Sequence, residues 1–169
     1  MSKEKNTDTL VLAQLAWVIK DIEKTKLFFQ KFIGITKFSP TVITRLEEFA
    51  GTYYDQSSKA ENHVSMAYAN GTFYELIQPI SGESIFMDFI NQNPDGGMQH
   101  IAYRTHISNL DKVISHYETN GFRIVSSFDT PIAKIVFFDT REEIGVFTEI
   151  MGITDEGEII VEKMKIDLS

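Results

Sequence analysis

The two halves of this 169-residue chain resemble each other, and this internal repeat constrains the fold more than any other feature of the sequence. The segment AQLAWV, which begins at residue 13, aligns with QHIAYR, which begins at residue 99. Gln14 then falls on His100, and Trp17 falls on Tyr103. A supersecondary unit that occurs twice in one chain predicts two stacked copies that share a core.

The far ends of the two halves also match. The segment TFYELI aligns with VFTEIM, so that Phe73 falls on Phe147 and Glu75 falls on Glu149. The offset between the copies is smaller here than at their beginnings, which indicates that the second copy has a shorter middle. Two polar positions therefore recur in the repeat, one in the first strand-like run of each copy and one in the last.

Each copy is predicted to contain a strand, a helix and three further strands. In the first copy, an apolar run at 10–19 precedes a helical stripe of Leu27, Phe28, Phe32 and Ile33, which we expect to face the core. Asp21 suits the N-cap of this helix and Gly34 suits the position after its end. The dipeptide Asn70-Gly71 lies between two strand-like runs and predicts a β-hairpin.

These patterns predict an α+β protein of two βαβββ modules whose curved sheets form a cleft. We place the first module at 9–80, a linker with a short helix at 81–97, the second module at 98–152 and a C-terminal extension at 153–169. The extension alternates partly between apolar and polar residues, which suggests an additional strand or an oligomer contact. Residues 1 to 8 are expected to form a disordered lead-in.

Charge and composition exclude several functions. The net charge of −8 disfavours nucleic acid and anionic membranes as partners, because both bind basic surfaces. The chain has no cysteine, so disulfides, thiolate catalysis and cysteine-based zinc sites are excluded. The polar N-terminus lacks a signal-peptide pattern, and no apolar run is long enough to span a bilayer. A cytoplasmic protein is therefore the expected class.

The recurring polar residues suggest a metal site. Glu75 and Glu149 stand among apolar neighbours, where a carboxylate is costly unless it is paired or coordinated. With His100 and Gln14 they make a mixed nitrogen and oxygen donor set whose charge of −2 would neutralise a divalent ion such as Zn, Ni, Co or Mn. Taken singly, each could be an ordinary strand residue that faces solvent. The match between the two copies favours the ligand hypothesis.

Two segments of the chain resemble a known family. LAQLAWVIKDIEKTKLFFQKFIGI is similar to the opening of modules of the vicinal oxygen chelate superfamily, which includes glyoxalases and bleomycin-resistance proteins. YELIQPISGESIFMDFINQNPDGGMQHIAY resembles more specifically the glyoxalase I and methylmalonyl-CoA epimerase branch. The resemblance covers about residues 10 to 151. It implies that Gln14, Glu75, His100 and Glu149 hold the metal. This order of ligands is seen among glyoxalase I enzymes, whereas epimerases more often have His first and Gln second.

The resemblance implies a metal-dependent lyase or isomerase similar to glyoxalase I (lactoylglutathione lyase). Such an enzyme would move a proton next to the metal-chelated carbonyl of a small-molecule carbonyl or thioester substrate. Glu149 is the first candidate for the catalytic base and Glu75 the second. A homodimer is also expected, because the open sheets of such modules commonly pair.

Two alternatives stay open at this point. A methylmalonyl-CoA epimerase-like isomerase would need a second base, for which Glu61 and Glu47 are nearby in sequence. A non-catalytic binding protein of the bleomycin-resistance type would hold a ligand in the cleft without metal chemistry. Basic residues for an anionic substrate would come from Arg45, Arg104 or Arg123. The remaining histidines, His63, His106 and His116, are assigned no role.

Overall fold

The structure is a computed structural model that describes residues 10–169. The lead-in expected at residues 1 to 8 lies outside the described residues. The strands of the first half are β1(Val11–Val18), β2(Val42–Arg45), β3(Thr52–Tyr53), β4(Gln56–Ser57), β5(Glu61–Ala69) and β6(Thr72–Ser81). Those of the second half are β7(Gly97–His106), β8(Ile124–Asp129), β9(Ala133–Phe138) and β10(Phe147–Ile153). The α-helices are α1(Ile22–Phe28), α2(Ile85–Gln92), α3(Leu110–Thr119), α4(Arg141–Ile144) and α5(Asp155–Asp167).

The ten strands found in residues 10–169 form one sheet in the order β2-β5-β6-β1-β7-β10-β9-β8-β3-β4. The two copies of the repeat meet where β1 pairs with β7 in antiparallel orientation. Within each copy the first and last strands are parallel neighbours, β1 with β6 and β7 with β10. Gln14 lies opposite Phe73 as His100 lies opposite Phe147. The two copies therefore share the same register, and the predicted α+β fold of two βαβββ units is confirmed.

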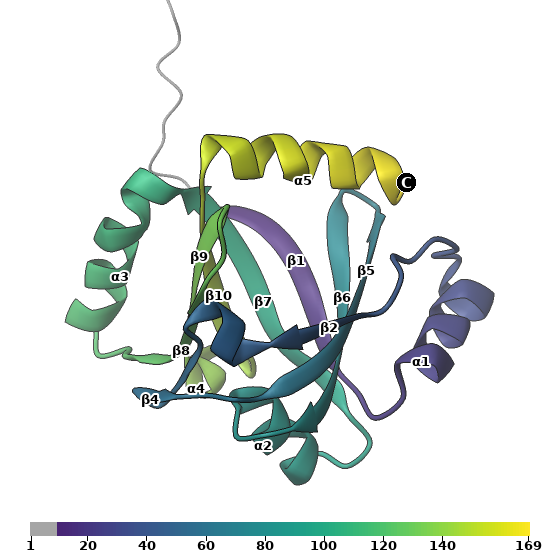
Figure 1. Ribbon diagram of the computed structural model, residues 1–169, viewed down its shortest axis with the longest axis horizontal. Helices are drawn as coiled ribbons and strands as arrows, with labels where there is room; N and C mark the ends of the chain where they lie inside the picture. Colours follow the sequence, from purple (N-terminus) through teal and green to yellow (C-terminus); the bar gives the residue numbers. More distant parts are fainter. Residues whose placement is uncertain (1–9) are drawn as a thin grey trace, which may run out of the picture.

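The sheet curls almost into a barrel (Figure 1). The segment that leaves the edge strand β2 forms a short 3-10 helix, η2(Leu46–Phe49), and then β3. Strand β3 pairs with β8 near the opposite edge of the sheet, with Thr52 beside Ser127. This connection brings the two edges together and leaves an enclosed concave face.

The helices α1 and α3 cover the convex face of the sheet on opposite flanks (Figure 1). Beneath α1, Ile22 packs with Ile19, Ala67 and Leu76 in one apolar cluster. Beneath α3, the corresponding cluster contains Leu110, Val136, Phe138 and Ile150. Because each helix buries the outward-facing residues of its own copy, the inward-facing residues remain available for a site.

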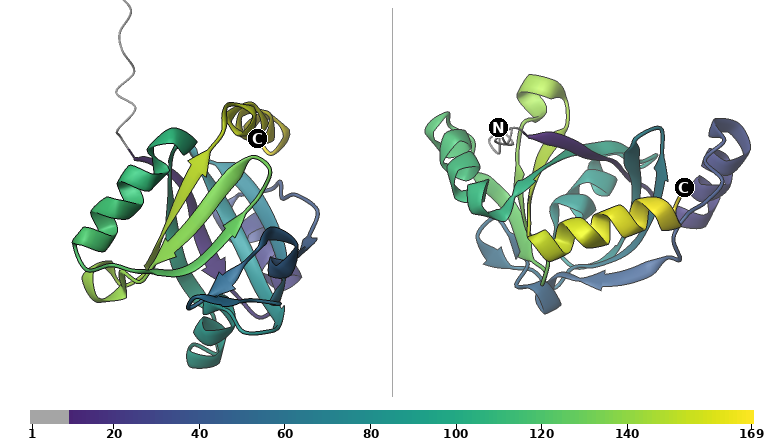
Figure 2. Two further views of the ribbon diagram at one scale, coloured as in Figure 1. Left: turned by 60° about the vertical axis from the view of Figure 1, so that its left-hand side comes forward. Right: turned by 90° about the horizontal axis from the view of Figure 1, so that it is seen from above.

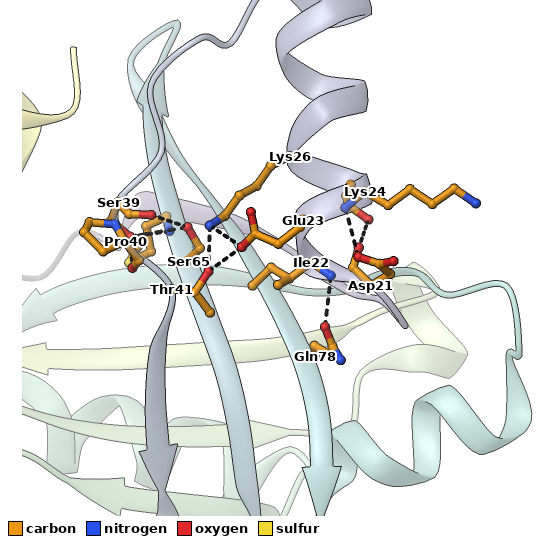
Figure 3. Close-up of polar contacts among 12 residues, drawn as sticks. Asp21, Ile22, Glu23, Lys24, Lys26, Ser39, Pro40, Thr41, Ser65 and Gln78 are labelled. Atoms are coloured by element: carbon orange, nitrogen blue, oxygen red, sulfur yellow. Dashed lines mark hydrogen bonds and ion pairs between the residues drawn. The ribbon is translucent and has the colours of Figure 1, made fainter.

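Polar contacts hold the start of α1 in place, and the backbone N of Ile22 donates to Gln78 Oε1 of β6 at 2.9 Å (Figure 3). Asp21 is the N-cap, as expected, and its Oδ1 accepts from the backbone N of Lys24 at 2.9 Å. Lys26 is buried and donates to Glu23 Oε1 at 3.0 Å and to Thr41 Oγ1 at 2.6 Å. These bonds satisfy a buried ammonium group, which would otherwise be costly.

The apolar stripe predicted for this helix does not face the core. Phe28 is 53% exposed and Phe32 is 66% exposed, whereas Phe29 is buried against Trp17. The helix continues from Phe29 as a π-helical turn, η1(Phe29–Ile33), which ends at Gly34 with φ of +81°. The buried face follows Ile22, Lys26 and Phe29, so the expectation from helical spacing was wrong for the exposed stripe.

The C-terminal extension forms a helix and not the additional strand that its alternation suggested. Thr154 is the N-cap of α5, and its Oγ1 accepts from the backbone N of Gly157 at 3.1 Å. Acidic residues occupy the first turn, where they interact favourably with the helix dipole. Figure 2 shows α5 lying across one end of the curved sheet.

Gly96 positions the strand that carries His100. Its φ is +76°, and a Cβ atom there would lie 2.7 Å from the backbone oxygen of Val18. We expect Gly96→Ala to lower the free energy of unfolding by about 1–3 kcal/mol, because the change adds a backbone clash to left-handed strain. Urea denaturation measures this cost. Gly121→Ala is the matched control, since φ there is +91° but the added Cβ meets nothing within 4 Å. Equal costs in the two variants would contradict the predicted clash.

Candidate metal centre

The four residues predicted from the repeat converge on the concave face of the sheet. Gln14 comes from β1, Glu75 from β6, His100 from β7 and Glu149 from β10, which are four consecutive strands of the sheet. The ligand atoms of Glu75, His100 and Glu149 all lie within 4.8 Å of one another. His100 Nε2 is 2.9 Å from Glu149 Oε2 and 3.3 Å from Glu75 Oε2. Residues that are up to 135 positions apart in the chain thus meet at one point.

Gln14 completes the group from the fourth strand. Its Nε2 donates to Glu75 Oε2 at 2.9 Å and to Glu149 Oε2 at 3.4 Å. The two ends of an amide are similar in shape, so a rotation of the side chain would place the oxygen where the nitrogen lies. In that orientation Gln14 would offer an oxygen ligand to a cation between the carboxylates.

A second contact orients the imidazole ring of His100. Its Nδ1 lies 2.5 Å from Gln99 Oε1, and a carbonyl oxygen only accepts, so Nδ1 carries a hydrogen. In the neutral ring Nε2 then presents a lone pair to the two carboxylates. His100 is fully buried and Nε2 has no hydrogen-bond partner among the described residues, so the ion pairs with the glutamates require a protonated ring. A bound cation would satisfy the same atom, which is the arrangement typical of metal-binding histidines.

Burial and charge act in opposite directions on the ionisation of this group. Burial by itself lowers the pKa of His100, but hydrogen bonds and charges from Glu149 and Glu75 outweigh it and raise the pKa to about 9. Burial raises the pKa of Glu149 above its usual range, although His100 opposes this effect. Without a metal the site therefore holds a proton on His100 near neutral pH, where a divalent ion would supply the positive charge instead.

The site opens into a large cavity inside the curved sheet. The cavity has a volume of about 400 Å³, and Gln14, Glu75 and Glu149 are part of its lining. His100 lies behind them and is fully buried. A small molecule in the cavity could therefore reach the carboxylates of both glutamates.

The other residues considered from the sequence lie away from this point. Glu61 is paired with Arg45 at 2.9 Å, and Glu47 is exposed; neither lines the cavity. Arg123 stacks over Tyr54, with its Cζ 5.9 Å from the ring centroid. Of the three arginines considered, only Arg104 lines the cavity.

Two features of the site escaped the sequence reasoning. Gln99 orients His100, and its position directly before a candidate ligand was the only signal for it. The helix α5 contributes Ile160, Val161 and Met164 to the cavity lining. Their apolar spacing was visible, but the partial alternation around them suggested a strand.

We expect Gln99→Leu to weaken divalent metal binding by about 10- to 100-fold. Without the acceptor, the imidazole ring of His100 can rotate, and nothing fixes which of its nitrogens carries the hydrogen. Titration calorimetry of the metal-free protein with Zn²⁺ measures the effect. Gln92→Leu, at an exposed position of α2, should leave the affinity unchanged. Full affinity in Gln99→Leu would show that the hydrogen bond does not organise the site.

Among residues 10–169, no helix is long and apolar enough to cross a membrane.

Comparisons with known proteins agree with this architecture. The sequence model of the Glyoxalase/Bleomycin resistance protein/Dioxygenase superfamily matches residues 13–138. The mitochondrial methylmalonyl-CoA epimerase of Bos taurus is 23% identical over 117 residues, which cover 68% of this chain. The chain spans only 57% of the length of that relative.

Solved structures of similar fold include two further epimerases. Methylmalonyl-CoA epimerase from Mycobacterium tuberculosis has a TM-score of 0.61 at 15% identity, over 86% of this chain and 89% of that chain. A variant of the Streptomyces coelicolor methylmalonyl-CoA epimerase, in complex with 2-nitronate-propionyl-CoA, has a TM-score of 0.59 at 18% identity. That match covers 86% of this chain and 96% of the other. At these identities the likeness concerns the fold.

Proposed function

Since the chain belongs to the glyoxalase/bleomycin resistance/dioxygenase superfamily, we propose that it is a divalent-metal-dependent isomerase that moves a proton next to a carbonyl group. One observation carries the proposal: two glutamates, a tautomer-fixed histidine and a glutamine converge on one point at the edge of a cavity. Of the described residues, only His100 forms an ion pair with either glutamate. A protein built only to bind a ligand has no need for two carboxylates held this close together.

Gln14, Glu75, His100 and Glu149 are the proposed metal ligands. Together they supply one neutral nitrogen, two anionic oxygens and one amide oxygen, a set that suits Zn, Ni, Co or Mn. A divalent ion held there would polarise a substrate carbonyl and lower the pKa of the adjacent C–H group. The chain's own residues must then remove, hold and return the proton.

Glu149 is the proposed base. Its side chain is only 3% exposed, and burial raises its pKa toward the working pH, which suits a group that both takes and gives a proton. Glu75 is more exposed, at 15%, and faces the same point from the neighbouring half of the sheet. We propose that Glu75 is the second base, which an epimerisation needs for return of the proton to the other face of the carbon. This assignment replaces Glu61 and Glu47, which do not line the cavity.

The epimerase type of isomerase has more support than the glyoxalase I type of lyase. The relatives reported above are epimerases by name. A glutathione adduct would also bring carboxylates that need cationic partners. The cavity is lined by Arg104 and Lys165, and both are already paired with glutamates of α5. The order Gln, Glu, His, Glu remains the feature that favours a glyoxalase.

Metal binding should release protons. His100, with a pKa raised to about 9, carries a proton at pH 7.5 in the metal-free protein and must lose it to coordinate an ion. We expect release of about one proton per ion at pH 7.5, and a release that declines as the pH rises above 9. Calorimetric titration in buffers of different ionisation enthalpy gives this number. Binding without proton release at pH 7.5 would contradict the role of His100.

Exchange of a substrate proton with solvent tests the proposed function directly. Metal-loaded protein is incubated in D₂O with acyl-CoA thioesters and with glutathione adducts of 2-oxoaldehydes, and deuterium incorporation is followed by NMR. We expect incorporation next to the carbonyl of a thioester, and none with metal-free protein. Exchange only with the glutathione adducts would favour the lyase. No exchange with either class, by protein of full metal content, would overturn the proposed proton transfer.

A further inference from the structure

The cavity beside the proposed metal centre has a mostly apolar wall. Its lining includes Val64 and Met66 from β5, Phe128 from β8, Ile135 and Phe137 from β9, and Met151 from β10. A cavity of about 400 Å³ lies within the range of small-molecule sites, in which a few polar groups orient an apolar ligand. The polar residues of the lining are Gln14, Glu75 and Glu149 at the proposed metal centre, and Thr44, Asn62, Arg104, Thr130 and Lys165 elsewhere.

The apolar part of the cavity runs from the metal centre to α5. Glu149, Met151 and Ile153 alternate along β10 and all line the cavity, so they share the concave face. At about 3.3 Å per residue, Ile153 lies about 13 Å along the strand from Glu149. The helix α5 starts two residues later and lies across this end of the sheet (Figure 2). There Ile160, Val161 and Met164 add further apolar side chains to the lining.

The basic residues at this end are neutralised from within the chain. Among the described residues that line the cavity, Arg104 is the arginine and Lys165 is the lysine. Arg104 Nη1 lies 2.6 Å from Glu158 Oε2, and Lys165 Nζ lies 2.6 Å from Glu162 Oε1. Both glutamates belong to α5. An acidic group on a ligand would therefore compete with a carboxylate that is already in place, or would be buried without a cationic partner.

We propose that the substrate carries an uncharged aliphatic chain, which lies in the cavity along β10 and beneath α5, while its carbonyl end meets Glu75 and Glu149. The position of the carbonyl end rests on the proposed function; the chemistry of the chain rests on the cavity wall alone. The cavity selects against substrates that carry an acidic group on the part that enters the cavity. The helix α5 is thus a determinant of specificity.

Alkyl hydroxamates of increasing chain length test the proposal, because the hydroxamate head chelates divalent ions and the chain can be varied independently. Dissociation constants are measured by calorimetry for the Co²⁺-loaded and the metal-free protein, and the visible spectrum of Co²⁺ reports contact with the head. Each buried methylene should tighten binding by up to about fourfold. Octanohydroxamate has about six more methylenes than acetohydroxamate, and burial of about four of them suffices for binding about 100-fold more tightly to the Co²⁺-loaded protein. An octyl analogue that ends in a carboxylate should lose most of this gain.

The outcomes separate this inference from the proposed function. If the Co²⁺ spectrum responds to every hydroxamate but affinity does not rise with chain length, the proposal of an aliphatic chain in the cavity is overturned. The proposed metal site then stands. If affinity rises with chain length, but each hydroxamate binds equally tightly with and without Co²⁺ and leaves the Co²⁺ spectrum unchanged, the chain site stands and the proposed metal chemistry fails. If the carboxylate-terminated analogue binds as tightly as octanohydroxamate, selection against acidic groups is overturned.

A substitution in α5 locates the chain. Met164→Asp puts a carboxylate into the lining at a partly exposed position and should weaken octanohydroxamate binding at least about tenfold. Acetohydroxamate binding should not change, which also shows that the variant is folded. Ile166→Asp is the matched control in the same helix, because Ile166 is 75% exposed and lies outside the cavity. Equal octanohydroxamate affinity in Met164→Asp and the wild type would remove α5 from the binding site.

Discussion

Glu149→Gln should lower the rate of deuterium incorporation into the substrate by about 100-fold or more, because positioned general bases contribute about 10²–10⁴ to such rates. Glutamine preserves the shape of the side chain and an oxygen ligand, but it cannot accept the substrate proton. The buried position of Glu149, 2.9 Å from His100 Nε2, should be retained in the variant. NMR measurement of exchange, alongside the metal content of the same preparation, provides the test.

Glu75→Gln is the matched control for this prediction, because it makes the same chemical change at the equivalent position of the other copy. If Glu149 removes the proton and Glu75 returns it, Glu75→Gln should keep exchange into one stereoisomer while slowing interconversion of the two. Loss of exchange in Glu75→Gln with normal exchange in Glu149→Gln would reverse the two roles. Normal exchange in both variants would exclude these glutamates as bases.

His100→Ala should lower the affinity for divalent metal by at least about 100-fold, since loss of a direct ligand costs more than the 10- to 100-fold lost with an outer partner. His100 provides the only nitrogen ligand of the proposed set, and it is fully buried between the two carboxylates. Its removal also leaves two glutamates facing each other without a cation, which disfavours the ionised pair. Metal content after dialysis and calorimetric titration with Zn²⁺ measure the loss.

His116→Ala is the control for His100→Ala, because His116 is exposed on α3, which covers the convex face of the sheet (Figure 1). It should bind metal as the wild type does. Wild-type affinity in His100→Ala would show that any ion binds elsewhere in the molecule. The proposed function would then lose the observation that carries it.

The internal repeat explains why so much of the site was predictable. The repeat pairs Gln14 with His100 and Glu75 with Glu149 in the amino-acid sequence alone. Equivalent residues of two similar units lie at equivalent registers, as Ala16 beside Glu75 and Ala102 beside Glu149 demonstrate. When such units pair through their first strands, the polar residues of both copies approach the same axis. The metal-ligand role of these residues stays a proposal.

The side of α1 that faces the core was less predictable, because the local apolar pattern and the tertiary packing disagree in this helix. The stripe of Phe28 and Phe32 has helical spacing, yet both rings are largely exposed. The helix changes to π geometry at Phe29, which rotates the following residues relative to an ideal α-helix. Nothing in the apolar periodicity signals that change.

The sequence by itself determined the repeated unit, its strands and helices, and the four polar positions that recur in it, since local spacing and turn residues carry that information. Only the tertiary structure decided which groups surround those positions. It placed Gln99 against His100, closed the sheet through β3 and β8, and laid α5 over the cavity with Glu158 on Arg104. Apart from the contact between Gln99 and His100, which are neighbours in β7, these contacts join residues from separate elements. Their distances depend on how the whole sheet curls, which no local pattern encodes.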